Sequence, residues 1–155
     1  MSGIIGRAGS RSGVIGTTEI DYEEGTYTPY FQVSGSNISG GSYTTQLGSY
    51  TKIGNIAHVF IDILLSAEGI SSGAIQVSLP FAQAGTYPAP ATIGYSSGFS
   101  NADSPNAGYV APSTAYIELI RGNSDDGRSM LKNGVGGDVI TATGAVKIQI
   151  TLKTS

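Results

Sequence analysis

Residues 56–65, Ile-Ala-His-Val-Phe-Ile-Asp-Ile-Leu-Leu, carry the clearest secondary-structure signal in this 155-residue sequence. Apolar residues alternate along the stretch with a period of two, which predicts a β-strand and not a helix. One face of this strand is entirely apolar and is expected to lie in the core; it holds Ala57, Val59, Ile61, Ile63 and Leu65. The opposite face is mixed, which predicts a partly covered surface. That second face holds His58, Phe60, Asp62 and Leu64.

The flanking sequence repeats the same pattern in shorter units. Gly54-Asn55 predicts a tight turn between this strand and a preceding one at Tyr43–Ile53, in which Gly48 marks a bulge or bend. The last strand, Val146 to Leu152, alternates apolar and polar residues over its whole length. Further strands are expected at Thr26–Val33, Ala74–Leu79, Ala91–Phe99, Tyr109–Val110, Ala115–Ile120 and Met130–Leu131.

No stretch of about ten residues shows a helical period, so almost no helix is expected. Many short strands separated by turn signals predict an all-β fold, an antiparallel β-sandwich with a jelly-roll-like arrangement. Pro29 interrupts the strand at Thr26–Val33 and is expected at a sheet edge or bulge, because proline cannot donate to a β-ladder.

The composition excludes several classes of function. Charged residues are 12% of the chain and the net charge is −3, without a clustered basic face, so no nucleic acid is expected as a partner. No apolar run is long enough for a membrane span, and no secretory signal is visible. The absence of cysteine excludes disulfides and thiolate metal sites.

An extended Gly-rich N-terminal arm, residues 1–20, is expected to precede a β-sandwich domain at residues 21–155. The arm contains a short repeat, because Ser2–Gly6 (SGIIG) returns as Ser12–Gly16 (SGVIG). So few apolar residues cannot form a core, but the two β-branched pairs can bind neighbouring pockets. The residues predicted to anchor the arm on a partner are Ile4, Ile5, Arg7, Arg11, Val14 and Ile15.

Three patterns suggest chemistry, and each has a simpler explanation. Gly94–Gly98 matches G-x-S-x-G, but the segment after it cannot form the helix of a nucleophile elbow, and the lone histidine, His58, precedes it. His58 itself is expected to be a hydrogen-bonded structural residue. Asn123–Gly127 has oxygen ligands but lacks the spacing of a calcium loop. We therefore expect no enzyme, no metal site and no cofactor.

Aromatic residues suggest a contact surface. Five tyrosines in the first third of the chain favour a subunit interface over sugar stacking: Tyr22, Tyr27, Tyr30, Tyr43 and Tyr50. The loops at 82–90 and 100–108 favour the alternative, a module that stacks aromatic rings on glycan. For that alternative the candidate residues are Tyr87, Tyr95, Phe99 and Tyr109.

The segments Glu23–Pro29 (EEGTYTP) and Gly48–Asn55 (GSYTKIGN) resemble a pattern of tailed-bacteriophage virion proteins. The pattern, EGTWTP…GxYTKIGN…GxxxIxLPF, occurs in tail-fibre domains, fibre tips and small head-associated proteins. Gly73–Phe81 (GAIQVSLPF) continues it, and Ala115–Leu119 falls where the family has a later strand. Tyr27 replaces the usual tryptophan. The resemblance spans about residues 19 to 120.

This resemblance implies a β-sandwich that is commonly trimeric. We therefore expect a non-enzymatic virion structural protein, assembled in the host bacterial cytoplasm. The expected form is a homotrimeric capsid cement, decoration or head-fibre protein whose arm docks on the major capsid protein or another virion protein. A short chain favours these forms over a long tail fibre. The alternative is a tail-fibre or receptor-binding module for host-surface glycan.

Overall fold

The computed structural model describes residues 21–38, 41–67, 73–99, 104–124, 127–130, 132–133 and 140–155, and within them it contains strands and turns but no helix. The strands are β1 (Tyr22–Tyr27), β2 (Phe31–Val33), β3 (Ser36–Asn37), β4 (Ser42–Ile53), β5 (Ile56–Ala67), β6 (Gly73–Ser78), β7 (Ala89–Phe99), β8 (Ala107–Val110), β9 (Tyr116–Ser124), β10 (Gly127–Met130), β11 (Lys132–Asn133) and β12 (Ile140–Lys153).

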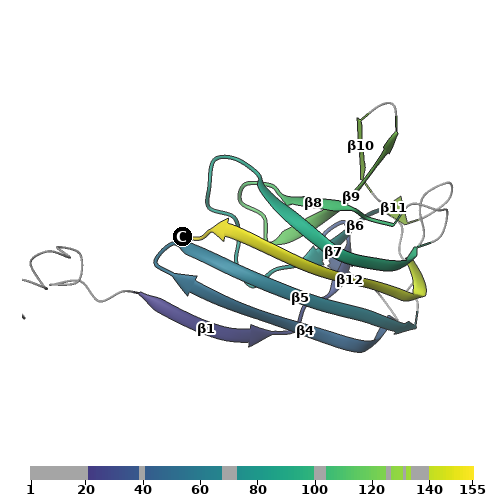
Figure 1. Ribbon diagram of the computed structural model, residues 1–155, viewed down its shortest axis with the longest axis horizontal. Coiled ribbons are helices and arrows are strands. Elements are labelled where there is room, and N and C mark those ends of the chain that lie inside the picture. Colours follow the sequence, from purple (N-terminus) through teal and green to yellow (C-terminus); the bar gives the residue numbers. More distant parts are fainter. Residues whose placement is uncertain are drawn as a thin grey trace, which may run out of the picture.

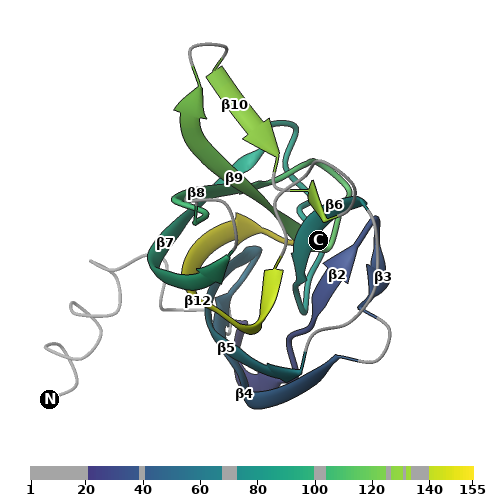
Figure 2. The ribbon, with the colours of Figure 1, turned by 90° about the vertical axis from the view of Figure 1, so that its right-hand side faces the viewer.

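All strand pairs of the described residues are antiparallel, and they form one continuous sheet. Its order is β1-β4-β5-β12-β7-β8-β9-β6-β2-β3, with β10 beside β9 and β11 beside β6. Figure 1 shows β1, β4, β5, β12 and β7 side by side as a broad curved face. In the turned view of Figure 2 the sheet curls round, so that β2 and β6 lie across from β4 and β5.

The curl follows from the short link between β1 and β2. These strands lie near opposite ends of the strand order, yet only Thr28, Pro29 and Tyr30 separate them in sequence. Tyr30 pairs with Ser78 of β6 through the bond from Ser78 N to Tyr30 O, at 2.9 Å. The prediction of one strand over Thr26–Val33 is therefore wrong. Because Pro29 cannot continue the ladder, the chain leaves one end of the sheet there and joins the other.

The core lies inside the curl and confirms the alternation predicted for β5 and β12. Ala57, Val59, Ile61, Ile63 and Leu65 of β5 are all buried, as the pattern predicts. The inward residues of β12 oppose them across the ladder. They are Val146, Ile148, Ile150 and Leu152, and all are buried. The all-β antiparallel class is thus confirmed, with one sheet enclosing the core as the two sheets of a sandwich do.

Two Gly-x-Tyr segments bind β1 to β4. In the antiparallel register Gly25 pairs with Tyr50 and Tyr27 pairs with Gly48. Each tyrosine ring covers the opposite glycine, since a Cβ on Gly25 would lie 2.7 Å from the Tyr50 hydroxyl. Gly48 is therefore not a bulge, as we expected, but the site where the Tyr27 ring packs. The ladder is regular at this point, and its irregularities lie nearer the start of β4.

The same contacts correct the expectation that the early tyrosines form a subunit interface. Tyr27, Tyr43 and Tyr50 are partly buried against the core of their own chain. The Tyr50 ring also meets Phe81 edge-on, with ring centroids 4.8 Å apart. Only Tyr22 and Tyr30 of the set are exposed.

Candidate interaction face

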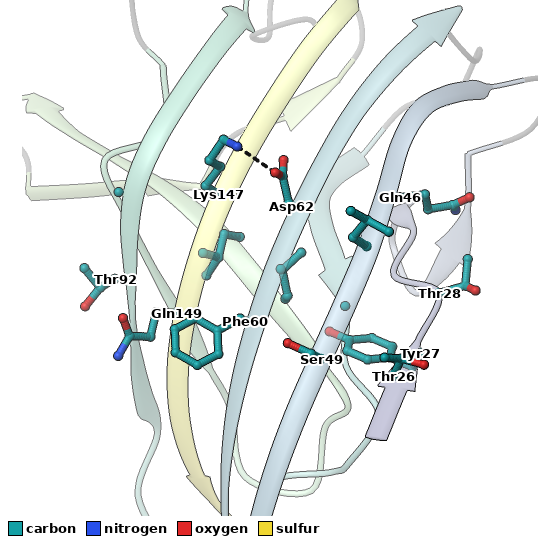
Figure 3. Close-up of a pocket in the computed structure, with 15 residues that line it drawn as sticks. Thr26, Tyr27, Thr28, Gln46, Ser49, Phe60, Asp62, Thr92, Lys147 and Gln149 are labelled. Atoms are coloured by element: carbon teal, nitrogen blue, oxygen red, sulfur yellow. Dashed lines mark hydrogen bonds and ion pairs between the residues drawn. The ribbon is translucent and has the colours of Figure 1, made fainter. Parts of the chain in front are cut away.

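The outward side chains of five neighbouring strands form one surface, which we call the apolar face. The register aligns these side chains in rows that run across β1, β4, β5, β12 and β7. A central row, visible in Figure 3, contains Thr26, Ser49, Phe60, Gln149 and Thr92. The adjacent row contains Leu47, Asp62, Lys147 and Tyr95.

A bulge in β7 keeps Tyr95 in this second row. Lys147 pairs with Tyr95 and Ile148 with Ile93, so that Gly94 is the extra residue between them. Without this shift the side chain of Tyr95 would project into the core, because successive residues of a strand point to opposite faces.

An open groove of about 860 Å³ crosses the two rows. Its lining comes from every strand of the apolar face and is mostly uncharged. It includes Thr26, Leu47, Ser49, Phe60, Asp62, Thr92, Gly94, Lys147 and Gln149. Gln46 lies at its margin, and the Nε2 atom of that side chain is buried without a hydrogen-bond partner among the described residues.

Large apolar side chains are concentrated on this face. Leu47 is 65% exposed and Phe60 is 49% exposed, although both lie in the middle of long strands. The full set of exposed large apolar residues on the apolar face is Tyr22, Leu47, Ile53, Ile56, Phe60 and Tyr95. Exposed apolar side chains gathered on one face favour an interaction site, although polar residues of the register separate them here.

Several charged and polar groups of the apolar face are paired with one another. Lys147 Nζ donates to Asp62 Oδ2 at 2.6 Å, across the β5–β12 ladder. The His58 ring lies between Thr151 Oγ1, at 2.8 Å from Nδ1, and Gln149 Nε2, at 3.0 Å from Nε2. His58 is therefore a hydrogen-bonded residue, as predicted.

At the margin of this face, the Tyr22 hydroxyl donates to Glu24 Oε2 at 2.7 Å. This hydrogen bond to a carboxylate raises the pKa of the Tyr22 phenol above its ordinary value.

The other half of the sheet presents a contrasting outer surface, which we call the polar row. It runs across β3, β2, β6, β9 and β8. Its members are Asn37, Gln32, Gln76, Glu118 and Tyr109. The Tyr109 hydroxyl donates to Glu118 Oε2, and Gln32 Nε2 donates to Asn37 Oδ1 at 3.1 Å.

Gln76 is almost fully covered, although its row faces outward. The residue is only 4% exposed, and the backbone N–H of Gly35 donates to its Oε1 at 2.7 Å. The turn between β2 and β3 thus covers this part of the polar row.

The residues predicted for the arm lie outside the described part of the chain, and their partner-binding role stays a prediction. They are Ile4, Ile5, Arg7, Arg11, Val14 and Ile15.

The structure does not bring the four predicted glycan-stacking residues together. Tyr95 is on the apolar face, whereas Tyr109 belongs to the polar row. Tyr109 pairs with Pro90 of β7, which precedes Tyr95 by five residues and so lies about 16 Å from it along the strand. Phe99 packs against the core. Tyr87 is highly exposed in the loop before β7.

The matches to catalytic and metal motifs have structural explanations where they are described. Gly94–Gly98 lies wholly within β7, and the Ser96 hydroxyl donates to the Pro105 carbonyl at 2.8 Å. Asp125 and Asp126 of the calcium-like segment lie outside the described residues. Elsewhere in the described chain, no three His, Asp or Glu side chains are grouped closely enough to hold a metal ion. A helix able to cross a membrane is also absent from these residues.

Sequence reasoning missed the apolar face as a site. The signal was present in the alternation itself, because Phe60 and Leu64 fall on the side of the strand opposite the core. Leu47, Ile53 and Ile56 were harder to assign. Their cross-strand partners are known only from the register, which local sequence patterns do not specify.

Comparison with known proteins supports the fold. No family model and no curated protein match this chain. Among solved structures, it is similar to the crystal structure of the Dettilon tailspike protein (gp208), with a TM-score of 0.56 and 12% sequence identity. The match covers 86% of this chain and 24% of the tailspike chain, so this chain spans about a quarter of that protein. The similarity shows a shared fold.

Proposed function

We propose that this protein is a non-enzymatic structural component of a bacteriophage virion. The observation that carries the proposal is the fold shared with part of a phage tailspike, on a chain that also exposes a broad apolar face. An exposed surface of this composition favours a protein whose working state is an assembly. The EEGTYTP and GSYTKIGN segments, which resemble virion proteins, form the Gly-x-Tyr pairs that join β1 to β4.

In the specific form of the proposal, the protein is a homotrimeric capsid cement, decoration or head-fibre protein held to the particle by its arm. Burial of each β-branched pair of the arm contributes about 2–4 kcal/mol. Three linked arms then bind far more tightly than one, because the second and third contacts form at a high effective concentration.

The test is incorporation into particles. A chain lacking residues 2–16 is expected to keep its far-ultraviolet circular dichroism spectrum and to be absent from purified particles. A full-length variant with Ile4, Ile5, Val14 and Ile15 changed to serine is the matched control for length, and it is also expected to be absent. Normal incorporation of both variants would contradict the proposal that the arm holds the protein to the particle.

The second candidate is a receptor-binding module for host-surface glycan, and the polar row supports it. Tyrosine, carboxylate and amide side chains are the groups that stack on sugars and bond their hydroxyls, and Tyr109, Glu118 and Gln32 supply all three. A reproducible signal on a glycan array, lost in Tyr109→Ala and kept in Tyr95→Ala, would favour this function. Loss in Tyr87→Ala would extend the site to the loop before β7.

The absence of enzymatic activity is part of the proposal and has its own test. Ser96 is the best candidate nucleophile by sequence, but its hydroxyl is engaged by the Pro105 carbonyl. We expect a covalent serine probe to leave the protein unlabelled. Labelling that disappears in Ser96→Ala would contradict the proposal.

A further inference from the structure

We infer that the apolar face is the surface on which copies of this chain pack against one another in the homotrimer. The inference deepens the proposed function and rests on it, since it names the partner of the candidate face. The occupant is a second copy of this chain, and the contact is centred on Phe60.

The position of Phe60 makes it the natural centre of such a contact. β5 is the middle strand of the five that form the face, and Phe60 lies in the central row of side chains. The ring meets His58 edge-on at 4.7 Å between centroids, which holds it across the strand. Aromatic anchors at the centre of a contact surface dominate the energy of most protein interfaces.

The aliphatic residues of the face fit a protein surface better than a sugar. Leu47, Ile53 and Ile56 are aliphatic and extend along β4 and β5 on either side of the centre. Aliphatic side chains offer no π-face for stacking and no hydrogen bond for a hydroxyl group. They are stabilised when another apolar surface removes them from water.

The charges of the face fit a copy of itself. Asp62 and Glu24 are balanced by Lys147 and Lys153, which leaves a net charge of zero on the surface. Two of these groups already form the 2.6 Å ion pair between Lys147 and Asp62. Identical faces of strong charge would repel one another, whereas this face presents no net charge to its copy.

The size of the face fits a ring in which every copy meets two others. Five strands spaced about 4.8 Å apart, over about 12 residues at 3.3 Å each, span on the order of 900 Å². Shared between two neighbours, this face gives about 450 Å² to each contact, roughly half of a standard interface, so the trimer depends on all three contacts of the closed ring together.

The first experiment measures the oligomeric mass of the full-length chain by light scattering. We expect a mass three times the 15.8 kDa of one chain. Phe60→Glu is expected to reduce that mass threefold, because it places a charge at the centre of the contact. Tyr87→Glu is the matched control, since Tyr87 is an exposed aromatic outside the face, and its trimer should persist. Circular dichroism and urea unfolding of the Phe60→Glu chain verify that it remains folded.

A second measurement locates the contact without disturbing it. The chain has no cysteine, so a single introduced cysteine takes up a pyrene maleimide at one site only. Ser49→Cys lies beside Phe60 in the central row, and its pyrene is expected to give excimer emission that dilution with unlabelled chain removes. Gln32→Cys, in the polar row, is expected to give monomer emission.

Several outcomes would overturn the inference. They are a monomeric wild-type chain, a trimer that survives Phe60→Glu, or excimer emission from Gln32→Cys in place of Ser49→Cys. A trimer that dissociates only when residues 2–16 are removed would assign the contact to the arm and would also overturn it. These results are distinguishable from a failure of the proposed function, which shows in particle incorporation and leaves the mass of the purified trimer unchanged.

Discussion

The apolar face and the polar row, the two outer surfaces of this single sheet, differ in the side chains that they expose to water. The apolar face, on β1, β4, β5, β12 and β7, pairs Lys147 with Asp62 and exposes large apolar side chains. The polar row, on the other half, pairs amides, a phenol and a carboxylate with one another and with a backbone turn. Both surfaces lie over the same core.

The difference is the basis of our inference that the apolar face, and not the polar row, meets another copy of the chain. A polar surface whose groups are mutually hydrogen-bonded is stable in water, whereas an apolar surface gains free energy only when something covers it. In this proposal one sheet provides a contact surface and a solvated surface, divided along the strand order.

The strongest test of this comparison detaches β1 from the apolar face. Gly48→Val places a side chain where the Tyr27 ring packs, since even a Cβ there would lie 2.7 Å from Tyr27 Cδ1. We expect a loss of about 2–3 kcal/mol in the free energy of unfolding in urea, as for overpacked cores.

Ser49→Val is the control for that substitution, because the neighbouring side chain projects outward from the same strand. Measured in the dissociated Phe60→Glu chain, as Gly48→Val also is, its stability should change by less than about 0.5 kcal/mol. Equal stability of the two variants would show that the Tyr27 ring does not depend on Gly48.

A matched pair of carboxylate deletions, both made in the dissociated Phe60→Glu chain, compares the two surfaces directly. Glu118→Ala removes the acceptor of the Tyr109 hydroxyl in a partly buried setting and should cost about 1–2 kcal/mol. Asp62→Ala, measured in the dissociated Phe60→Glu chain, removes only an exposed ion pair and should cost less than about 1 kcal/mol. The reverse order, by urea unfolding of both, would contradict the assignment of the polar row as the internally bonded surface.

The smallest expected effect on stability concerns the hydrogen bond that joins β1 to β6. Tyr27 of β1 donates to the Ser78 carbonyl of β6, at 3.4 Å, and burial raises the pKa of its phenol above the ordinary value of 10.0. The unfolded chain therefore loses this proton first. Stability is complete below about pH 10 and falls by up to about 1.4 kcal/mol per pH unit above it, until the folded state also ionises.

Tyr27→Phe should remove this contribution to the loss of stability above about pH 10. Tyr95→Phe changes an exposed phenol and should leave the loss of stability as it is in the wild-type chain. Urea unfolding between pH 9 and pH 11 measures both variants against the wild-type chain. An unchanged pH dependence in Tyr27→Phe would show that the Tyr27 phenol is not the titrating group.

Local patterns in the sequence determined the class of the fold. Alternation at Ile56–Leu65 and Val146–Leu152 identified both long central strands and their buried faces, because side-chain direction along a strand has a strict period of two. The turn predicted at Gly54-Asn55 is confirmed. Gly54 adopts a positive φ of 57°, a conformation that glycine favours. The expected resemblance to phage virion proteins is supported as a likeness of fold, while its motif stays a prediction.

The tertiary structure alone decided which exposed residues share a surface. Leu47 and Phe60 come from the two strands of one hairpin and Tyr95 from the more distant β7, and they share a face because the register of three ladders and the bulge at Gly94 align them. The role of Pro29 and the pairing of Gly48 with Tyr27 likewise depend on which strands become neighbours. A period of two tells which way a side chain points, but it carries no information on what lies beside it across the sheet.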